Sequence, residues 1–260
     1  MGILDIGYGT IIGLSLGLTG AGGSIITIPI LIYLLNMNAH VATGTSLVIV
    51  GVGALAGAIQ YSFGKTKYLH WRIGFLFAIA GIVGAFLGSY FNALLPSYLI
   101  LYLFATLMVI IGIMMLREKN YAKETGAPSL KNVRGLSEWL KFVGAGLFIG
   151  FMTGFFGVGG GFLIVPVLVL ILDFPMKHAI ATSLMVIALN CLWGILSRLS
   201  GVGTIAWGTA LYLVIGAVIG IVIGVLIAKK IKAGSLTKIF AYFVIALAIY
   251  MFLRTMGIIA

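Results

Sequence analysis

The sequence predicts an all-α protein that crosses a membrane several times and is built from two related halves. Hydrophobic residues make up 62% of the 260 residues and charged residues only 8%, and the mean hydropathy is +1.24. A soluble domain carries about 25% charged residues. Uncharged runs such as residues 73–116 are long enough to span a bilayer. The third observation is a glycine-rich break that occurs twice, 137 residues apart.

The two breaks are expected to be the centre of the protein. The first is Gly-Ala-Gly-Gly-Ser at residues 20–24, followed by Pro29, and the second is Gly-Val-Gly-Gly-Gly at residues 157–161, followed by Pro166. Clustered glycine disfavours a helix by about 1 kcal/mol per residue relative to alanine, and proline removes a backbone donor. In a membrane, such interruptions are tolerated only where the freed backbone groups are buried in protein or line a cavity. We therefore expect the two breaks to meet and to form a substrate site.

Each broken stretch is followed by three further apolar segments. The first half contains the stretch 3–36 and segments near 42–63, 71–92 and 97–116, and the second contains 140–172 and segments near 178–198, 205–228 and 236–256. The Thr-Ser-Leu sequence at residues 45–47 also recurs at residues 182–184. The chain is therefore divided into a first transmembrane repeat (1–118), a linker (119–138) and a second transmembrane repeat (139–260), as in many secondary transporters.

Each broken stretch is predicted to be a re-entrant hairpin, and the two repeats to have inverted topology. A helix of 34 residues would be about 51 Å long, against a hydrocarbon core of about 30 Å. With hairpins, fourteen of the sixteen Lys and Arg residues lie on one side of the membrane, whereas a crossing stretch leaves eleven there. The hairpin model thus has the stronger positive-inside asymmetry. It predicts a prokaryotic inner-membrane protein with residues 117–139 cytoplasmic and both termini outside.

The hairpin tips, together with polar residues of the next helix in each half, are the predicted substrate site. Helix N-termini carry about half a positive charge and bind anions through free N–H groups, although a simple tight turn is the alternative. Ser46 and Gln60 share a helical face with Gly53, because the three are spaced by seven residues. The candidate substrate-binding residues are Gly22, Gly23, Ser24, Thr45, Ser46, Gln60, Gly159, Gly160, Gly161, Thr182, Ser183 and Asn190.

The distribution of charge favours an anionic substrate. The five acidic residues fall at segment ends or in the linker, whereas cation and proton carriers usually place Asp or Glu at the membrane centre. Arg198 could attract an anion at the mouth of the site, or could simply extend to the interface. His40 and His178 could be gates, proton carriers or interfacial caps.

Glycine also recurs at every fourth position in three segments, a spacing typical of closely packed membrane helices. The three series are Gly9, Gly13 and Gly17; Gly146, Gly150 and Gly154; and Gly216, Gly220 and Gly224. The G-x-S-x-G match around Ser15 lies in the first series. A hydrolase motif of this kind needs a strand-to-helix turn, so an intramembrane serine hydrolase is only a minor alternative and the chain is predicted not to be an enzyme.

The net charge, the motifs and the cysteine content limit the partners that the sequence predicts. The net charge of +11 is interpreted as a topology signal rather than as a nucleic-acid surface. No metal or cofactor motif is present, and the single cysteine, Cys191, cannot form an internal disulfide. A small anion and the lipid bilayer are the expected partners, and a homodimer is left open. A passive anion channel is the main alternative to a transporter.

These motifs resemble the TauE/SafE sulfite exporter family from about Gly13 to Arg254. The shared features are a duplicated G-x-G-G-[S/G] break with a proline five or six residues on, at 20–29 and 157–166, and an Ala/Gly-Thr-Ser-Leu sequence at 44–47 and 181–184. The resemblance implies alternating-access transport of sulfur-containing or organic anions such as sulfite or sulfoacetate. The pattern departs at Gly161, where the first half has Ser24, and at Ala181, where the first half has Gly44.

Overall fold

The computed structural model describes residues 2–63, 68–92, 94, 96–117, 136–156, 161–199 and 205–256. All secondary structure within these residues is helical, which confirms the predicted all-α class. The first half contains α1 (Gly2–Thr19), α2 (Gly22–Pro29), the π-helix η1 (Ile30–Leu34), α3 (Ala39–Ser62), α4 (Trp71–Asn92) and α5 (Ser97–Arg117). The second half contains α6 (Leu136–Phe156), α7 (Gly161–Leu170), α8 (Met176–Leu199), α9 (Trp207–Lys230) and α10 (Ala233–Thr255).

Helices of membrane-spanning length and composition dominate the fold. Five of the described helices, α3, α4, α8, α9 and α10, are long and apolar enough to cross a bilayer, and α1, α5 and α6 contribute shorter apolar stretches. Large apolar side chains point outward from them, and the side chain of Phe86 on α4 is 80% exposed. A helix that is apolar all round suits a lipid environment. The prediction of a polytopic membrane protein is therefore confirmed.

The first broken stretch folds back on itself at Gly20. This residue has a φ of +73°, a left-handed conformation that glycine adopts without a steric penalty, and it separates α1 from α2. Gly23 then packs against α1, where a Cβ would lie 2.6 Å from the Cβ of Leu16. The π-helix η1 follows directly after Pro29, whose missing N–H already interrupts the hydrogen-bond ladder.

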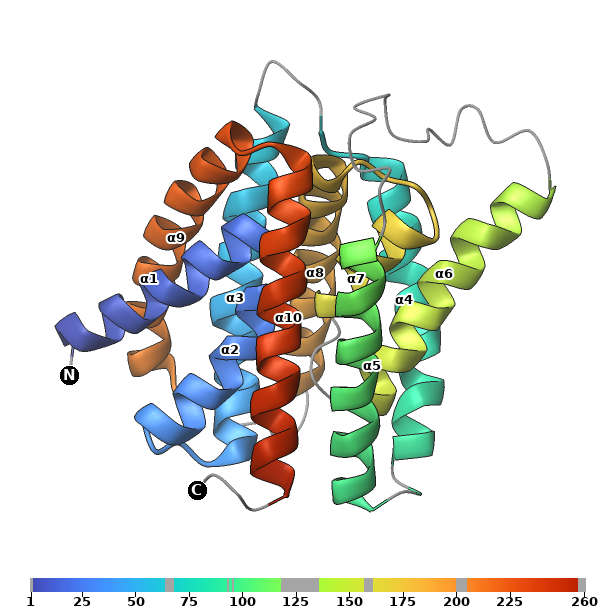
Figure 1. Ribbon diagram of the computed structural model, residues 1–260. Helices are drawn as coiled ribbons and strands as arrows, with labels where there is room; N and C mark the ends of the chain where they lie inside the picture. Colours follow the sequence, from blue (N-terminus) through green and yellow to red (C-terminus); the bar gives the residue numbers. More distant parts are fainter. Residues whose placement is uncertain are drawn as a thin grey trace.

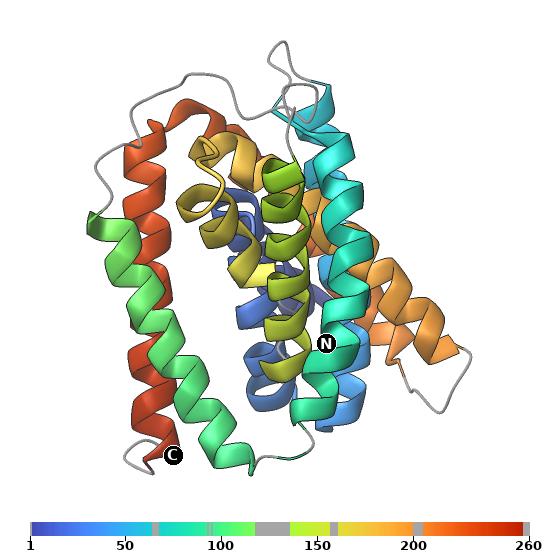
Figure 2. The same cartoon turned by 90° about the vertical axis from the view of Figure 1, so that its right-hand side faces the viewer.

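Corresponding helices of the two halves make corresponding contacts. The most extensive packing joins α1 to α9 and α6 to α4, while α3 packs on α8 in the middle of the molecule and α5 packs on α10 (Figures 1 and 2). The returning half-helices α2 and α7 also touch. Figure 1 shows α1 rising and α2 descending from the first break, whereas α6 descends and α7 rises. These directions are those that an inverted repeat requires, and the duplication itself stays a prediction.

The predicted glycine series form the closest helix contacts. Gly13 on α1 lies against the carbonyl of Ala217 on α9, and Gly220 on α9 lies against the carbonyl of Thr10 on α1. A Cβ at either position would overlap the facing backbone. In the other pair, Gly150 on α6 meets the backbone of Gly81 on α4 in the same way. The interpretation of these glycines as helix-packing surfaces is confirmed, because only a missing side chain allows such a close approach.

Candidate functional site

The tip of the first hairpin is buried and is held by the other half of the chain. Gly20, Ala21, Gly22 and Gly23 are all buried. The hydroxyl of Ser183 on α8 lies 2.9 Å from the carbonyl oxygen of Gly20 and 2.8 Å from that of Ile180, so its single proton is shared between these two acceptors. The break thus lies inside the protein, as membrane-embedded irregular backbone must.

The backbone amides of this tip already have a local acceptor. The N–H of Gly22 donates to Oγ1 of Thr19 at 2.8 Å, and that hydroxyl in turn donates to the carbonyl of Ser15 at 2.7 Å. An anion at the start of α2 would therefore compete with the Thr19 hydroxyl for the Gly22 amide. Ser24 follows in the first turn of the same short helix.

The second tip is only partly described. The predicted site residues Gly159 and Gly160 lie outside the described residues, while Gly161 is buried as the first residue of α7. Ser46, the counterpart of Ser183 on α3, makes the matching local bond, from its hydroxyl to the carbonyl of Thr43 at 2.8 Å. The residue that corresponds to Gly20 is Gly157, which also lies outside the described part of the chain.

Two further candidates, Thr45 and Gln60, lie at opposite ends of α3. Oγ1 of Thr45 accepts a bond of 3.1 Å from the N–H of Ala206, just before α9. Gln60 lies in the last turn of α3, where Nε2 donates to the carbonyl of Val222 at 3.2 Å. The backbone carbonyl of Gln60 accepts a bond of 2.9 Å from Nζ of Lys229, whereas the side-chain Oε1 is buried without a hydrogen-bond partner among the described residues. The structure therefore does not gather all predicted residues at one point.

Two candidates on α8 have buried oxygens without a hydrogen-bond partner in the described part of the chain. They are Oγ1 of Thr182 and Oδ1 of Asn190. Buried polar atoms are normally paired, so an orphaned one needs an explanation, such as a missing ligand or a bond made in another conformation. Thr182 is wholly buried, whereas Asn190 borders a cavity.

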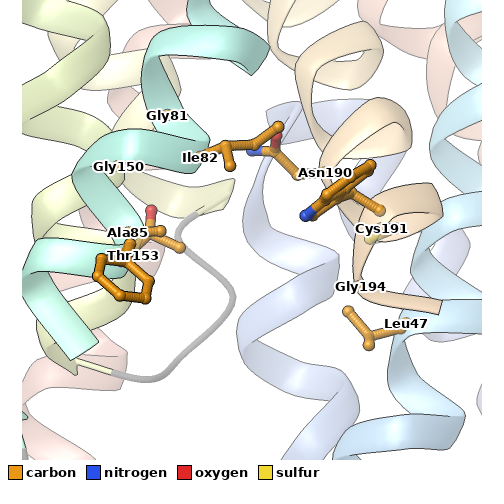
Figure 3. A pocket seen from close by; sticks show the side chains of 11 residues that line it. Leu47, Gly81, Ile82, Ala85, Gly150, Thr153, Asn190, Cys191 and Gly194 are labelled. Carbon is orange, nitrogen blue, oxygen red and sulfur yellow. The ribbon is translucent and has the colours of Figure 1, made fainter. Parts of the chain in front are cut away.

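This cavity of about 400 Å³ lies between α3, α4, α6 and α8 (Figure 3). Its walls are mainly apolar, with side chains such as Leu47, Phe86 and Trp193. Asn190 and Thr153 supply polar groups from opposite walls, α8 and α6. Thr153 was not predicted, and its own hydroxyl donates to the carbonyl of Ile149 at 2.7 Å. The cavity can hold a solute with an apolar part and a hydrogen-bonding part.

The equivalent place in the other half is filled. Position 16, which corresponds to Thr153, is a leucine, and position 53, which corresponds to Asn190, is a glycine. A Cβ at Gly53 would lie 3.6 Å from Cδ2 of Leu16 and 3.8 Å from the Cβ of Ala217, in ordinary van der Waals contact. The pair Leu16 and Thr153, 137 residues apart, is the sequence signal that could have revealed this asymmetry.

The fold and this site define a polytopic helical membrane protein with a broken helix at its centre. Among the described residues, no group of three or more His, Cys, Asp or Glu could hold a metal ion. Residues 6–251 match the family described as sulfite exporter TauE/SafE, and the chain belongs to this family.

Its curated relatives cover most of the chain. A probable membrane transporter protein of Xylella fastidiosa is 35% identical over 258 residues, which is 97% of this chain and 95% of the relative. The probable membrane transporter protein YunE of Bacillus subtilis is 30% identical over 239 residues, which is 83% of this chain and 84% of the relative. No solved structure matches the chain.

Proposed function

We propose that the chain is a secondary transporter that moves a small sulfur-containing or organic anion, such as sulfite or sulfoacetate, across the prokaryotic inner membrane. Membership of the TauE/SafE family and relatives named as probable membrane transporter proteins support the transport function. The observation that carries the proposal is the buried helix break at Gly20, which a hydroxyl from the opposite half holds in place. Broken helices at the interface of two halves are where secondary transporters bind substrate.

In this proposal each hairpin moves relative to its scaffold and exposes the site to one side of the membrane at a time. Amides at the start of α2 and at Gly159–Gly161 hold the oxyanion. Thr182 offers a hydroxyl donor, and Ser183 offers a second one when its bond to Gly20 is broken. Asn190, with Thr153 opposite, lines the path through the cavity. Thr45 and Ser46 have the same roles in the other half, and Gln60 lies at the end of the path. The end of the molecule that carries Lys177 and Lys229 faces the cytoplasm, and both termini lie outside.

The test of this function begins with purified protein in detergent. Sulfite, thiosulfate, sulfoacetate and simple carboxylates are screened for a rise in melting temperature, because a ligand that binds only the folded state stabilises it. The anions that bind are then followed into proteoliposomes. Saturable uptake with counterflow is expected of a transporter, whereas a passive anion channel shows neither. Undiminished anion uptake by the Ser15→Ala variant would exclude the hydrolase alternative.

Gly22→Leu is the variant that tests the site. A Cβ at Gly22 would already lie 2.7 Å from Oγ1 of Thr19 and 2.8 Å from Cε1 of Phe243, so a leucine displaces the tip. Uptake should fall by about tenfold or more, which corresponds to about 1.4 kcal/mol per tenfold. Gly144→Leu is the matched control, because no described residue lies within 4 Å of a Cβ at Gly144. Normal uptake by folded, membrane-inserted Gly22→Leu would refute a site at the first break.

A further inference from the structure

Two histidines join the halves of the chain at one end of the molecule. Nε2 of His70 lies 3.1 Å from Nδ1 of His178, within hydrogen-bond distance. His70 directly precedes α4 in the first half, and His178 lies in the first turn of α8 in the second. This is the end at which α3 and α9 finish, and we call it the lysine-bearing end because Lys177, Lys229 and Lys230 lie there (Figure 1).

The histidine pair is part of a layer of aromatic side chains that closes this end. The ring of Phe174 meets the ring of His70 edge-on at 5.6 Å, and the ring of Tyr68 meets that of His178 at 5.1 Å. Tyr61 in turn meets Tyr68 at 5.9 Å. Tyr61 and Phe174 are buried. The cavity beside Asn190, by contrast, lies twelve residues further along α8, which corresponds to about 18 Å.

The opposite end of the molecule is joined by an equivalent link of different chemistry. There, Thr45 on α3 accepts a hydrogen bond from the N–H of Ala206, which directly precedes α9. In both links, a side chain of the central helix (α3 or α8) contacts the residue that directly precedes a helix of the other half (α9 or α4). Ala206, before α9, thus corresponds to His70, before α4. Thr182, the counterpart of Thr45, has no partner for its hydroxyl in the described part of the chain. Only the link at the lysine-bearing end consists of two imidazoles, the side chains whose unperturbed pKa lies closest to physiological pH.

We propose that the His70–His178 pair is a proton-binding site of the transporter, whose neutral form holds the lysine-bearing end closed and whose protonated form opens it. This inference rests on the proposed transport function. In the neutral pair, one ring N–H donates to the lone pair of the facing nitrogen. When both rings are protonated, both facing nitrogens carry a proton, so no acceptor remains and two positive charges repel each other. The protons come from the solution at that end and return to it when the pair forms again.

Two lysines lie near the pair, and burial of His70 sets the direction of the pH dependence. Nζ of Lys177 donates to the carbonyl of Lys229 at 3.0 Å, and Nζ of Lys229 lies 5.0 Å from the centre of the Tyr61 ring. Burial lowers the pKa of His70 below its ordinary value. The pair is therefore neutral above the ordinary histidine pKa of about 6.5, and opening begins as the pH falls below it. The other charged or titratable described residues next to the pair in sequence or in this chain of contacts are Tyr61, Tyr68, Arg72, Asp173, Lys177 and Lys229.

Proton binding and anion binding favour each other in this arrangement. An anion that enters between the lysines stabilises positive charge on the imidazoles, and by linkage protonated imidazoles raise the affinity for the anion. The effect reaches the hairpin through α8, because Ser183 follows His178 by five residues, or about 7.5 Å. Ser183 holds the carbonyl of Gly20. A displacement of the first turns of α8 therefore acts directly on the tip of the first hairpin.

The experiment measures opening without any anion, using the full chain in liposomes with Cys191→Ala to remove the native thiol. Leu69→Cys reports on the buried layer, and Phe63→Cys, at a position that is 87% exposed, corrects for the effect of pH on thiol reactivity. A membrane-impermeant thiol reagent is applied at about pH 8 and about pH 5.5, on either side of the histidine pKa of about 6.5. At each pH, the labelling rate of Leu69→Cys is divided by that of Phe63→Cys. This ratio should be about fivefold or more higher at about pH 5.5 than at about pH 8, because fivefold is the lower end of typical allosteric coupling.

Glutamine variants assign the response to the pair. His178→Gln and His70→Gln keep a hydrogen-bonding side chain that does not titrate, and each should abolish the rise, whereas His40→Gln, at the third histidine, should retain it. The proposal would be overturned if the labelling ratio were the same at both pH values in the protein with both histidines. It would also be overturned if the ratio still rose at low pH in both His70→Gln and His178→Gln. If the ratio responds as expected while no anion from the screen is exchanged, the transport function fails and the proton-controlled opening stands.

Discussion

The hydroxyl of Ser183 lies 2.9 Å from the carbonyl oxygen of Gly20, to which it donates a hydrogen bond across 163 positions in the chain. Gly20 is the left-handed residue that turns the first hairpin, and Ser183 belongs to the central helix of the other half. Both residues are buried. The bond therefore couples the broken helix of one half to the central helix of the other, and the hairpin movement that we propose has to break it.

Ser183→Ala should weaken this connection. The Gly20 carbonyl then loses a buried hydrogen bond, which costs about 1–3 kcal/mol. We expect a lower melting temperature in detergent and reduced anion uptake. Thr106→Ala is the control, because Thr106 is exposed and its hydroxyl bonds to the carbonyl of Tyr102 in its own helix. Equal melting temperatures for the two variants would contradict the role assigned to Ser183.

Gly20→Ala should be more damaging than a typical glycine replacement. An alanine in the left-handed conformation costs about 1–2 kcal/mol, and its Cβ would lie 2.7 Å from Oγ of Ser183 and 2.9 Å from Cα of Ile180. We expect a loss of stability that thermal unfolding detects. Combining it with Ser183→Ala should cost less than the sum of the two single changes, because the clash and the bond share one partner. Strictly additive effects would speak against the contact.

Gly13→Ala should separate α1 from α9. The added methyl group would overlap the carbonyl of Ala217, and overpacking of this kind costs about 1–3 kcal/mol. Gly7→Ala, in the same helix, is the matched control, because no atom of the described part of the chain lies within 4 Å of a Cβ at Gly7. Alanine is favoured over glycine in helices by about 1 kcal/mol, so the control should not lose stability. The measurement is thermal unfolding of both proteins in the same detergent.

Asn190→Leu should reduce anion uptake without lowering the stability of the protein. The change removes a buried oxygen that has no partner among the described residues, so the melting temperature should stay equal or rise. Uptake of the anion should fall, because the cavity loses a polar group that the proposed path uses. Leu192→Ala is the control on the exposed side of the same helix. Unchanged uptake with Asn190→Leu would remove Asn190 from the path.

Several features of the fold could be predicted because they are properties of one segment at a time. The apolar stretches mark the spanning helices, and the glycine cluster at 20–23 marks the break, because missing side chains and left-handed backbone conformation are local effects. The glycine spacing on α1 and α9 predicts close packing for the same reason. The site was harder to predict. Thr153 was missed because nothing in its own helix distinguishes it from a hydroxyl that bonds its own backbone, which its side chain also does.

By itself, the sequence determined that this chain lies in a membrane, that a helix breaks at Gly20 and where glycines allow helices to touch. Hydropathy and backbone conformational freedom are properties of each residue, so they can be interpreted without knowing which segments pack together. Only the tertiary structure decided that Ser183 reaches Gly20, that Thr153 faces Asn190 across a cavity and that His70 meets His178. Each of these pairs joins segments far apart in the chain. Their meeting depends on the register between packed helices, which the periodicity of a single helix does not contain.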